Sequence, residues 1–290
     1  MVQNAGNKLT QVVLRQVEKA EYFCSAENIS PNVAIHELRK TFKRLRALFR
    51  IYEHVSGSKV KNLRTEIKEF GKVLSPLRES YVNTDLFEKE LTGKKFIPER
   101  KMKLIGEKLH NKNKKLIDER FREKSVCKRI GSYFSRFETK LNVTGGEKVS
   151  KAHVVREVYD SYLTSFSTYR GLPDNPAPEE WHSMRKKLKR LYFQLDFIRL
   201  FHPRYFKLKS EQLNTINDQL GDDHDLHVFA EELHQEDYQL NAEELKLMEK
   251  QIEHLRELNQ LKLRPRLKHF FGDPPGEFKE KLEKAFKIEF

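Results

Sequence analysis

The chain has 290 residues, enough for one large domain or two of ordinary size. Charged residues make up 34% of it, which is too much for a membrane protein, and aromatic residues make up 11%, which is too much for a disordered chain. The net charge of +13 favours an anionic partner, such as nucleic acid, an anionic membrane or another polyanion, over the alternative of a basic surface that is only solvated.

Glycine and proline are scarce, at 12 and 10 residues, and few hairpin signals occur, so the sequence predicts an all-α protein. Ser30 is expected to cap the second helix and Pro31 to be its first residue. The breakers bound predicted helices over residues 7–26, 31–54, 59–75, 77–92, 99–141, 147–170, 178–202, 205–220, 223–235, 241–271 and 276–287.

The helices that contain His36 and His182 carry the same sequence pattern. Counted from each histidine, six of ten residues are identical, at an offset of 146 residues. Shorter segments that begin at Leu74 and Leu220 keep the same offset. Two segments repeated in one order at one offset predict an internal duplication. We therefore expect two helical bundles of the four-helix type, related by a pseudo-two-fold axis, over residues 1–145 and 146–290, with the boundary at Thr144–Gly146.

On each of these two helices, apolar residues recur with the 3-4-3-4-3 spacing of a helix face that packs in a bundle. They are Ile35, Leu38, Phe42, Leu45, Phe49 and Tyr52 in the first copy, and Trp181, Met184, Leu188, Leu191, Leu195 and Ile198 in the second. A basic arc about 80° wide adjoins each stripe. If the halves pack face to face, the two arcs form one positive central groove or pore.

The basic arcs supply most of the candidate anion-binding residues. From His36 to Arg50 there are six Lys or Arg and one acid, and such repulsion favours an anion that fills the groove. Arg78 and His224 occupy matched positions farther along, and the basic stretch 100–129 offers two further cations. The full candidate set is His36, Arg39, Lys43, Arg46, Arg50, Arg78, Lys114, Arg120, His182, Arg185, Lys189 and His224.

These motifs resemble the signatures of the CHAD family, the conserved histidine α-helical domain. One is carried by His36, Arg39, Lys43, Arg44 and Arg46, a second by His182, Arg185, Lys189 and Asp196, and a third by Leu220, Gly221 and Asp225. The sequence departs from the family pattern at three positions, which are Tyr192 for Arg, Ser75 for Gly and Glu79 for Asp.

The resemblance implies two four-helix bundles that enclose a basic pore, and a module that binds inorganic polyphosphate without being an enzyme. It also implies association with polyphosphate granules and leaves enzymes of polyphosphate metabolism as possible further partners. We expect no cofactor. The absence of an apolar run long enough to span a bilayer and of a secretory signal, with Cys24 and Cys127 far apart in sequence, predicts a cytoplasmic location.

Several residues admit a second interpretation. His36 and His182 could cap or hydrogen-bond within their helices, or contact phosphate either as neutral donors or as cations. Arg44 and Arg190 point away from the histidines and are as readily solvated as functional. The stretch from Gly221 to His227 looks metal-like, but structural capping is the favoured interpretation, so no metal is expected. Asp218 and Asp225 are expected to orient basic side chains.

Two other functions compete with polyphosphate binding. Duplex nucleic acid could use the same cations through its shape, although single-strand binding would need aromatic side chains among them. A phosphatase or phosphotransferase that uses His36 is the second rival, but the sequence has no P-loop and no convincing carboxylate set for Mg²⁺.

Overall fold

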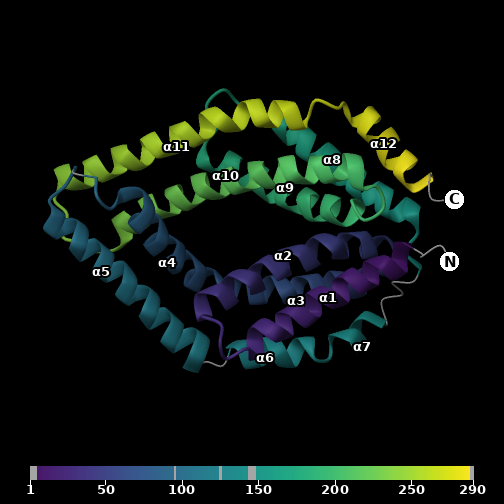
Figure 1. The fold of residues 1–290 in the computed structure, drawn as a ribbon, viewed down its shortest axis with the longest axis horizontal. Helices are drawn as coiled ribbons and strands as arrows, with labels where there is room; N and C mark the ends of the chain where they lie inside the picture. Colours follow the sequence, from purple (N-terminus) through teal and green to yellow (C-terminus); the bar gives the residue numbers. More distant parts are fainter. Residues whose placement is uncertain (1–4, 95, 124–125, 143–147, 288–290) are drawn as a thin grey trace.

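The computed structural model describes residues 5–94, 96–123, 126–142 and 148–287, and in these residues it contains helices, turns and loops but no strands. The protein is therefore all-α (Figure 1). Its elements are α1 (Ala5–Ser25), α2 (Pro31–Ser56), α3 (Ser58–Val73), α4 (Ser75–Leu86), the π-helix η1 (Phe87–Leu91), α5 (Glu99–Leu116), the π-helix η2 (Ile117–Glu123), α6 (Val126–Phe134), α7 (Phe137–Asn142), α8 (Lys151–Arg170), α9 (Pro178–Ile198), α10 (Pro203–Gln235), α11 (Ala242–Phe270) and α12 (Pro275–Lys287).

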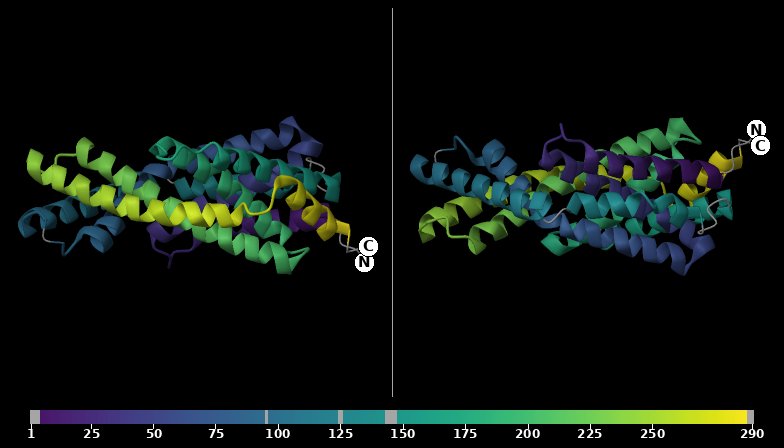
Figure 2. Two further views of the ribbon diagram at one scale, coloured as in Figure 1. Left: turned by 90° about the horizontal axis from the view of Figure 1, so that it is seen from above. Right: turned by 90° about the horizontal axis from the view of Figure 1, so that it is seen from below.

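The molecule is elongated, as Figures 1 and 2 show. Helices α1 to α3, α6 and α7 lie on one side, and α8 to α12 lie on the other. At one end, α4 and α5 meet the ends of α10 and α11, whereas α1 begins and α12 ends at the opposite end. In the described residues, no helix is both long and apolar enough to cross a membrane.

Two hydrophobic clusters hold these helices together. The larger one combines buried residues of α1 to α3 with those of α6 to α12. The smaller one joins α4, η1 and α5 to the C-terminal part of α10 and the N-terminal part of α11, through residues such as Leu109, Phe229 and Met248. Each cluster thus takes helices from both sides of residue 145. The division at that residue stays a prediction, and the proposed boundary Thr144–Gly146 lies outside the described residues.

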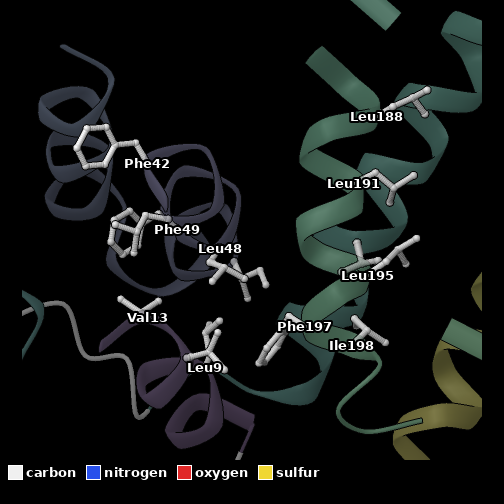
Figure 3. Packing of buried hydrophobic residues seen from close by; sticks show 14 of the residues in the cluster. Leu9, Val13, Phe42, Leu48, Phe49, Leu188, Leu191, Leu195, Phe197 and Ile198 are labelled. Atoms are coloured by element: carbon white, nitrogen blue, oxygen red, sulfur yellow. The ribbon is translucent and has the colours of Figure 1, made fainter. Parts of the chain in front are cut away.

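Helices α2 and α9, which carry the repeated motif, lie side by side across the middle of the molecule. All twelve residues of the two predicted apolar stripes are buried, with at most 2% of their surface exposed. In Figure 3, Phe42 and Phe49 point from α2 away from α9, and Leu188 and Leu191 point from α9 away from α2. The stripes therefore face separate parts of the core, which leaves the basic arcs to face the space between the helices.

The predicted start of α2 is confirmed. The Ser30 side chain accepts a hydrogen bond of 3.4 Å from the Val33 backbone N–H, and Pro31 is the first helical residue. The helix ends at Gly57, whose φ of 50° lies in the left-handed region that favours glycine. These two ends fix the register of α2 and so the direction in which its cations point.

The predicted break between 220 and 223 is wrong, because α10 is one continuous helix. Gly221 lies in its interior beside the guanidinium of Arg185, whose Nη2 an added Cβ would meet in ordinary van der Waals contact, at 3.5 Å. The predicted single helix over 99–141 is also wrong. Its parts serve different cores, since α5 buries Leu109 in the smaller cluster and α6 buries Ile130 in the larger one, so the chain changes direction between them.

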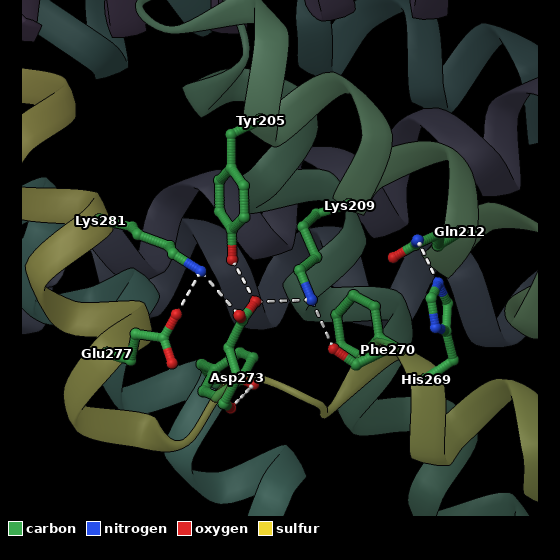
Figure 4. Close-up of polar contacts among 9 residues, drawn as sticks. Tyr205, Lys209, Gln212, His269, Phe270, Asp273, Glu277 and Lys281 are labelled. Carbon is green, nitrogen blue, oxygen red and sulfur yellow. Dashed lines mark hydrogen bonds and ion pairs between the residues drawn. The ribbon is translucent and has the colours of Figure 1, made fainter.

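The C-terminal helix α12 is fastened by a polar network around Asp273 (Figure 4). The Tyr205 hydroxyl and the Lys209 ammonium donate to one carboxylate oxygen, at 2.5 and 2.8 Å, and Lys281 donates to the other at 2.7 Å. The Tyr162 hydroxyl donates to the backbone carbonyl of Asp273 at 2.6 Å. This network ties α12 to α8 and α10, away from the basic arcs.

Candidate functional site: two cavities that meet at a basic waist

Two cavities lie between α2, α4, α9 and α10. The larger cavity has a volume of about 1240 Å³ and extends to α3 and α5, and the smaller cavity has a volume of about 590 Å³. They share a set of lining residues that we call the waist. The waist consists of Arg39 and Lys43 of α2, Glu79 and Asn83 of α4, Arg185, Lys189 and Phe193 of α9, and His224 and Val228 of α10.

Most of the residues expected from the sequence line one or both cavities. Arg39, Lys43, Arg185, Lys189 and His224 lie in the waist. Arg46, Arg50, Arg120 and His182 line the larger cavity alone, and His36 and Arg78 line the smaller one alone. Lys114 is exposed on α5 and lines neither.

Of the two candidates in the basic stretch 100–129, Arg120 lines the larger cavity and Lys114 does not. Lys112 faces the larger cavity in place of Lys114, because two helical residues point about 200° apart. The Lys112 ammonium is already paired, at 2.7 Å to Glu232 and 2.8 Å to Glu236. It therefore braces α5 against α10 at the rim of the cavity.

Helix α3 supplies cavity residues that the sequence-based candidate set lacks. Arg64, Lys68 and Lys72 line the larger cavity from this helix. Their 4-4 spacing, preceded by Lys61, is that of one helical face, so the signal was present in the sequence. Helix α9 adds Lys186, Lys187 and Arg190, which makes the larger cavity richer in cations than the basic arcs alone suggest.

Arg44 and Arg190 occupy matched positions but have different roles. Arg44 forms an ion pair with Asp196 of α9, which also accepts from Arg199 at 2.7 Å. Asp196 is buried, with 5% of its surface exposed, so this pair contributes to the contact between α2 and α9. Arg190 lines the larger cavity, and its buried Nε has no hydrogen-bond partner among the described residues.

One contact recurs at the offset of 146 residues. The Arg39 guanidinium donates to Ser75 Oγ at 2.6 Å, and the matched Arg185 guanidinium packs on Gly221. Arg39 donates in addition to the Gly71 carbonyl at 2.6 Å. Both arginines are thereby held against the helix that follows, at the centre of the site.

The two histidines also have matched neighbours. The His182 and His224 rings stack with centroids 4.6 Å apart. The matched His36 lies close enough to Arg78 for that cation to lower its pKa, although burial is the larger cause. Burial, followed by Arg185 and His182, lowers the pKa of His224 to about 3. His224 is therefore neutral at physiological pH. Burial also lowers the pKa of His36 and of His182, which favours the neutral mode predicted as one alternative for these two histidines.

Lys43 is the most perturbed cation of the waist. Burial lowers its pKa to about 7, and the neighbouring Arg185, Arg39 and Lys189 add to the effect. Burial likewise lowers the pKa of Lys189, of Arg46 and of Arg190. The Nε atoms of Arg46 and Arg185 are buried with no hydrogen-bond partner among the described residues. Such a site is short of negative charge and of acceptors.

Asp218 and Asp225 lie where they can attract the waist cations. Asp225 opposes the lowering of the pKa of Lys43 and of Arg78, and Asp218 does the same for Lys189. The pKa of Asp225 itself is raised by burial, against the opposing effect of Arg185. Both aspartates line the smaller cavity.

The capping interpretation of Gly221–His227 is wrong, since this stretch lies inside α10. Asp223 is buried and accepts from Gln260 at 2.8 Å, so it ties α10 to α11. Across the described ranges, no group of three or more His, Cys, Asp or Glu side chains is arranged to hold a metal ion.

Comparison with known proteins agrees with the fold. The structure is similar to that of PptA from Streptomyces chartreusis, with a TM-score of 0.63 and 13% identity, over 92% of this chain and 100% of that one. No curated protein matches the sequence. A model of the CHAD domain matches residues 12–234, which include every residue of the waist and most of the chain. The chain therefore belongs to the CHAD family.

Proposed function

We propose that the protein binds inorganic polyphosphate, without catalysis, at the waist and in the larger cavity. The observation that carries this proposal is the meeting of Lys and Arg side chains from α2, α3 and α9 around one cavity, with buried guanidinium nitrogens that have no partner in the described structure. Phosphate oxygens would supply both the missing acceptors and the missing charge. Membership of the CHAD family supports the same ligand.

Polyphosphate suits this site better than nucleic acid does. It has about one negative charge per phosphate and no bases, so cation–phosphate contacts and counterion release would dominate its binding. Apart from histidine, the aromatic lining of the larger cavity in the described residues is Phe193, which is only 2% exposed. Bases would find no platform on which to stack there. Duplex recognition through shape alone remains the competing function.

We propose binding without turnover. A phosphotransferase that uses His36 would need its phosphate in the smaller cavity, since His36 lines only that one. His36 and Arg78 are therefore not required for the proposed binding. Release of orthophosphate from polyphosphate by the pure protein would contradict this part of the proposal.

We also propose that the chain arose by internal duplication and that the protein is cytoplasmic and associates with polyphosphate granules. The repeated contacts of Arg39 with Ser75 and of Arg185 with Gly221 support a pseudo-two-fold axis near the waist. Family membership supports a cytoplasmic protein that associates with polyphosphate granules and with the enzymes that act on them. A fluorescent fusion that stays diffuse in cells with visible granules would contradict the last point.

The test is a titration of the purified chain with long-chain polyphosphate, duplex DNA and single-stranded DNA at physiological salt. The double variant Arg46→Gln, Arg190→Gln removes two cations from the larger cavity. The control, Arg15→Gln with Arg266→Gln, removes two exposed arginines elsewhere. We expect the first variant to weaken polyphosphate binding at least about tenfold, since charge-assisted contacts contribute about 1.5–3 kcal/mol each. Equal losses in both variants, or tighter binding of DNA, would refute the proposal.

A further inference from the structure

The two cavities differ sharply in charge, although the same four helices line both. Outside the waist, ten Lys or Arg and two carboxylates line the larger cavity among the described residues. On the same count, the smaller cavity has two cations, Lys40 and Arg78, and three carboxylates, Asp218, Asp222 and Asp225. A linear polyanion that crosses the waist would therefore meet an acidic wall on the far side.

The difference in charge arises at matched positions of the repeat. Lys68, Lys72 and Pro76 line the larger cavity from α3 and α4. Their counterparts 146 residues later line the smaller cavity from α10 and are Asn214, Asp218 and Asp222. The two cavities are thus related by the same offset as the sequence repeat, but two cationic positions have become neutral or acidic in the second copy.

The third acid of the smaller cavity, Asp225, lies on the same face of α10 as the other two. Asp218, Asp222 and Asp225 are spaced by four and three residues, so they lie on one face of α10. Asp218 and Asp222 are exposed, and Asp218 accepts a hydrogen bond of 2.9 Å from the Asn214 side chain. Burial and the neighbouring Asp225 and Asp218 raise the pKa of Asp222 to about 6, so this side chain is mostly ionised at neutral pH and repels a phosphate chain.

Carboxylates attract cations on both sides of the waist. In the larger cavity, Arg64 pairs with Glu53 and Lys72 with Glu69, both at 2.8 Å. Arg78 is attracted to Asp225, and Lys189, on the waist, is attracted to Asp218. In the larger cavity, Arg46 and Arg190 have buried nitrogens without partners among the described residues. The difference between the cavities therefore lies in the numbers of cations and carboxylates that line them.

On the basis of the proposed function, we infer that the polyanion occupies the larger cavity and the waist and is excluded from the smaller cavity by Asp218, Asp222 and Asp225. The binding path is then one-sided, in spite of the repeat. These aspartates are specificity residues: they decide which of two related cavities accepts the chain, and they keep it from threading through the molecule.

Two lysines at matched positions allow a direct test. Lys186 lines only the larger cavity and Lys40 lines only the smaller one, and both are exposed on equivalent turns of α9 and α2. We expect Lys186→Gln to weaken polyphosphate binding about fivefold and to lower the salt slope by about one counterion. Lys40→Gln should leave the affinity within about twofold of the native value.

The aspartates are then tested in a second background. In the variant Asp218→Asn, Asp222→Asn, polyphosphate should gain access to the smaller cavity, so the affinity rises and Lys40→Gln now weakens binding several-fold. All four substituted residues are exposed, and thermal melting checks that each variant is folded.

Three results would overturn the inference. If Lys40→Gln and Lys186→Gln weaken binding equally in the native background, the polyanion uses both cavities. If Lys40→Gln leaves the affinity unchanged in the Asp218→Asn, Asp222→Asn background, the aspartates do not exclude the ligand. A native chain that does not bind polyphosphate would refute the proposed function, and the inference with it, and this result is distinct from the first two.

Discussion

Lys43 is surrounded by like charge, since Arg39, Arg185 and Lys189 contribute with burial to lowering its pKa to about 7. A phosphate group beside it would reverse this effect and favour the charged form. Binding of polyphosphate should therefore be coupled to proton uptake wherever the free lysine is partly neutral.

We expect this uptake to approach one proton per protein at about pH 8 and to be much smaller at about pH 6, where Lys43 is already charged. Isothermal calorimetry in buffers that differ in ionisation enthalpy measures it directly. The variant Lys43→Arg stays charged throughout and should bind without the uptake. Binding enthalpies that do not depend on the buffer at the higher pH would show that Lys43 does not meet the ligand.

We expect Lys43 to lower the stability of the fold while it strengthens polyphosphate binding. Replacing a repelled, half-buried ammonium with an apolar side chain of similar length should stabilise the fold, so Lys43→Met is expected to raise the free energy of unfolding by about 1–2 kcal/mol near neutral pH. The variant should at the same time bind polyphosphate more weakly.

The pH dependence follows from the direction of the shift. The folded chain releases the Lys43 proton at about pH 7 and the unfolded chain at about 10.5, so between these values the unfolded state holds more protons and native stability rises with pH. The gain in the free energy of unfolding from Lys43→Met is therefore largest below about pH 7 and decreases towards pH 10.5. Urea unfolding at several pH values measures it, and a loss of stability in the variant near neutral pH would contradict the expected repulsion.

For single residues, the sequence predicts which side chains face the site better than it predicts which of them form ion pairs. Helical periodicity places Arg39 and Arg185 correctly, because their position on the helix follows from spacing alone. The different roles of Arg44 and Arg190 depend on whether a buried acid stands opposite. Asp196 lies 152 residues from Arg44, so local spacing gives no sign of their pairing.

The sequence predicts a helix boundary correctly where a local capping residue fixes it. It fails where tertiary packing sets the boundary. Ser30 and Pro31 fix the start of α2 by local chemistry. Gly221 suggests a break, but α10 continues through it, and the Arg185 guanidinium lies beside it. The interruptions between α5 and α7 arise because two cores compete for one basic stretch, which no short window of sequence reveals.

Helix α12 allows a prediction about stability. Burial disfavours the charge on Asp273, but hydrogen bonds from Lys209, Lys281 and Tyr205 outweigh this and hold its pKa below the usual range. We expect Asp273→Asn to lower the free energy of unfolding by about 2–4 kcal/mol at neutral pH, because Lys209, nearly buried, loses its counter-charge.

The stabilisation by Asp273 is present above the ordinary pKa of about 3.8 and is lost as pH falls through the lower folded-state pKa. The difference between the native chain and Asp273→Asn should therefore shrink in strong acid. Chemical denaturation at neutral and acidic pH tests this, with the exposed Asp174→Asn as the control. A difference that persists unchanged in strong acid would show that the carboxylate charge is not what fastens α12.

Across the whole molecule, the repeat predicts that the basic arcs of α2 and α9 line a shared space, but not that the two sides of this space differ. The difference depends on α3 and on the first part of α10, whose roles as cavity walls appear only in the assembled fold. Lys72 and Asp218 stand at matched positions in the printed sequence. Their opposite charges bear on ligand binding only because Lys72 lines the larger cavity and Asp218 the smaller one, and these two cavities meet at the waist.

The concentration of unpaired cations around the waist should also govern the thermal stability of the whole chain. Without a ligand, added salt screens their repulsion and should raise the melting temperature. With polyphosphate at about a hundred times its dissociation constant, binding to the native state adds about 2.7 kcal/mol, and the melting temperature should rise by about 5 °C.

The two effects should oppose each other, because salt that screens the cations also weakens the bound polyanion. The shift caused by polyphosphate is therefore expected to be largest at low salt and to vanish as salt increases. Differential scanning calorimetry of the native chain and of Arg46→Gln, Arg190→Gln measures both effects. The variant should melt higher without ligand and respond less to either addition. If the variant melts at a lower temperature than the native chain and polyphosphate raises its melting temperature by the same amount, the cations of the larger cavity neither destabilise the fold nor bind the anion.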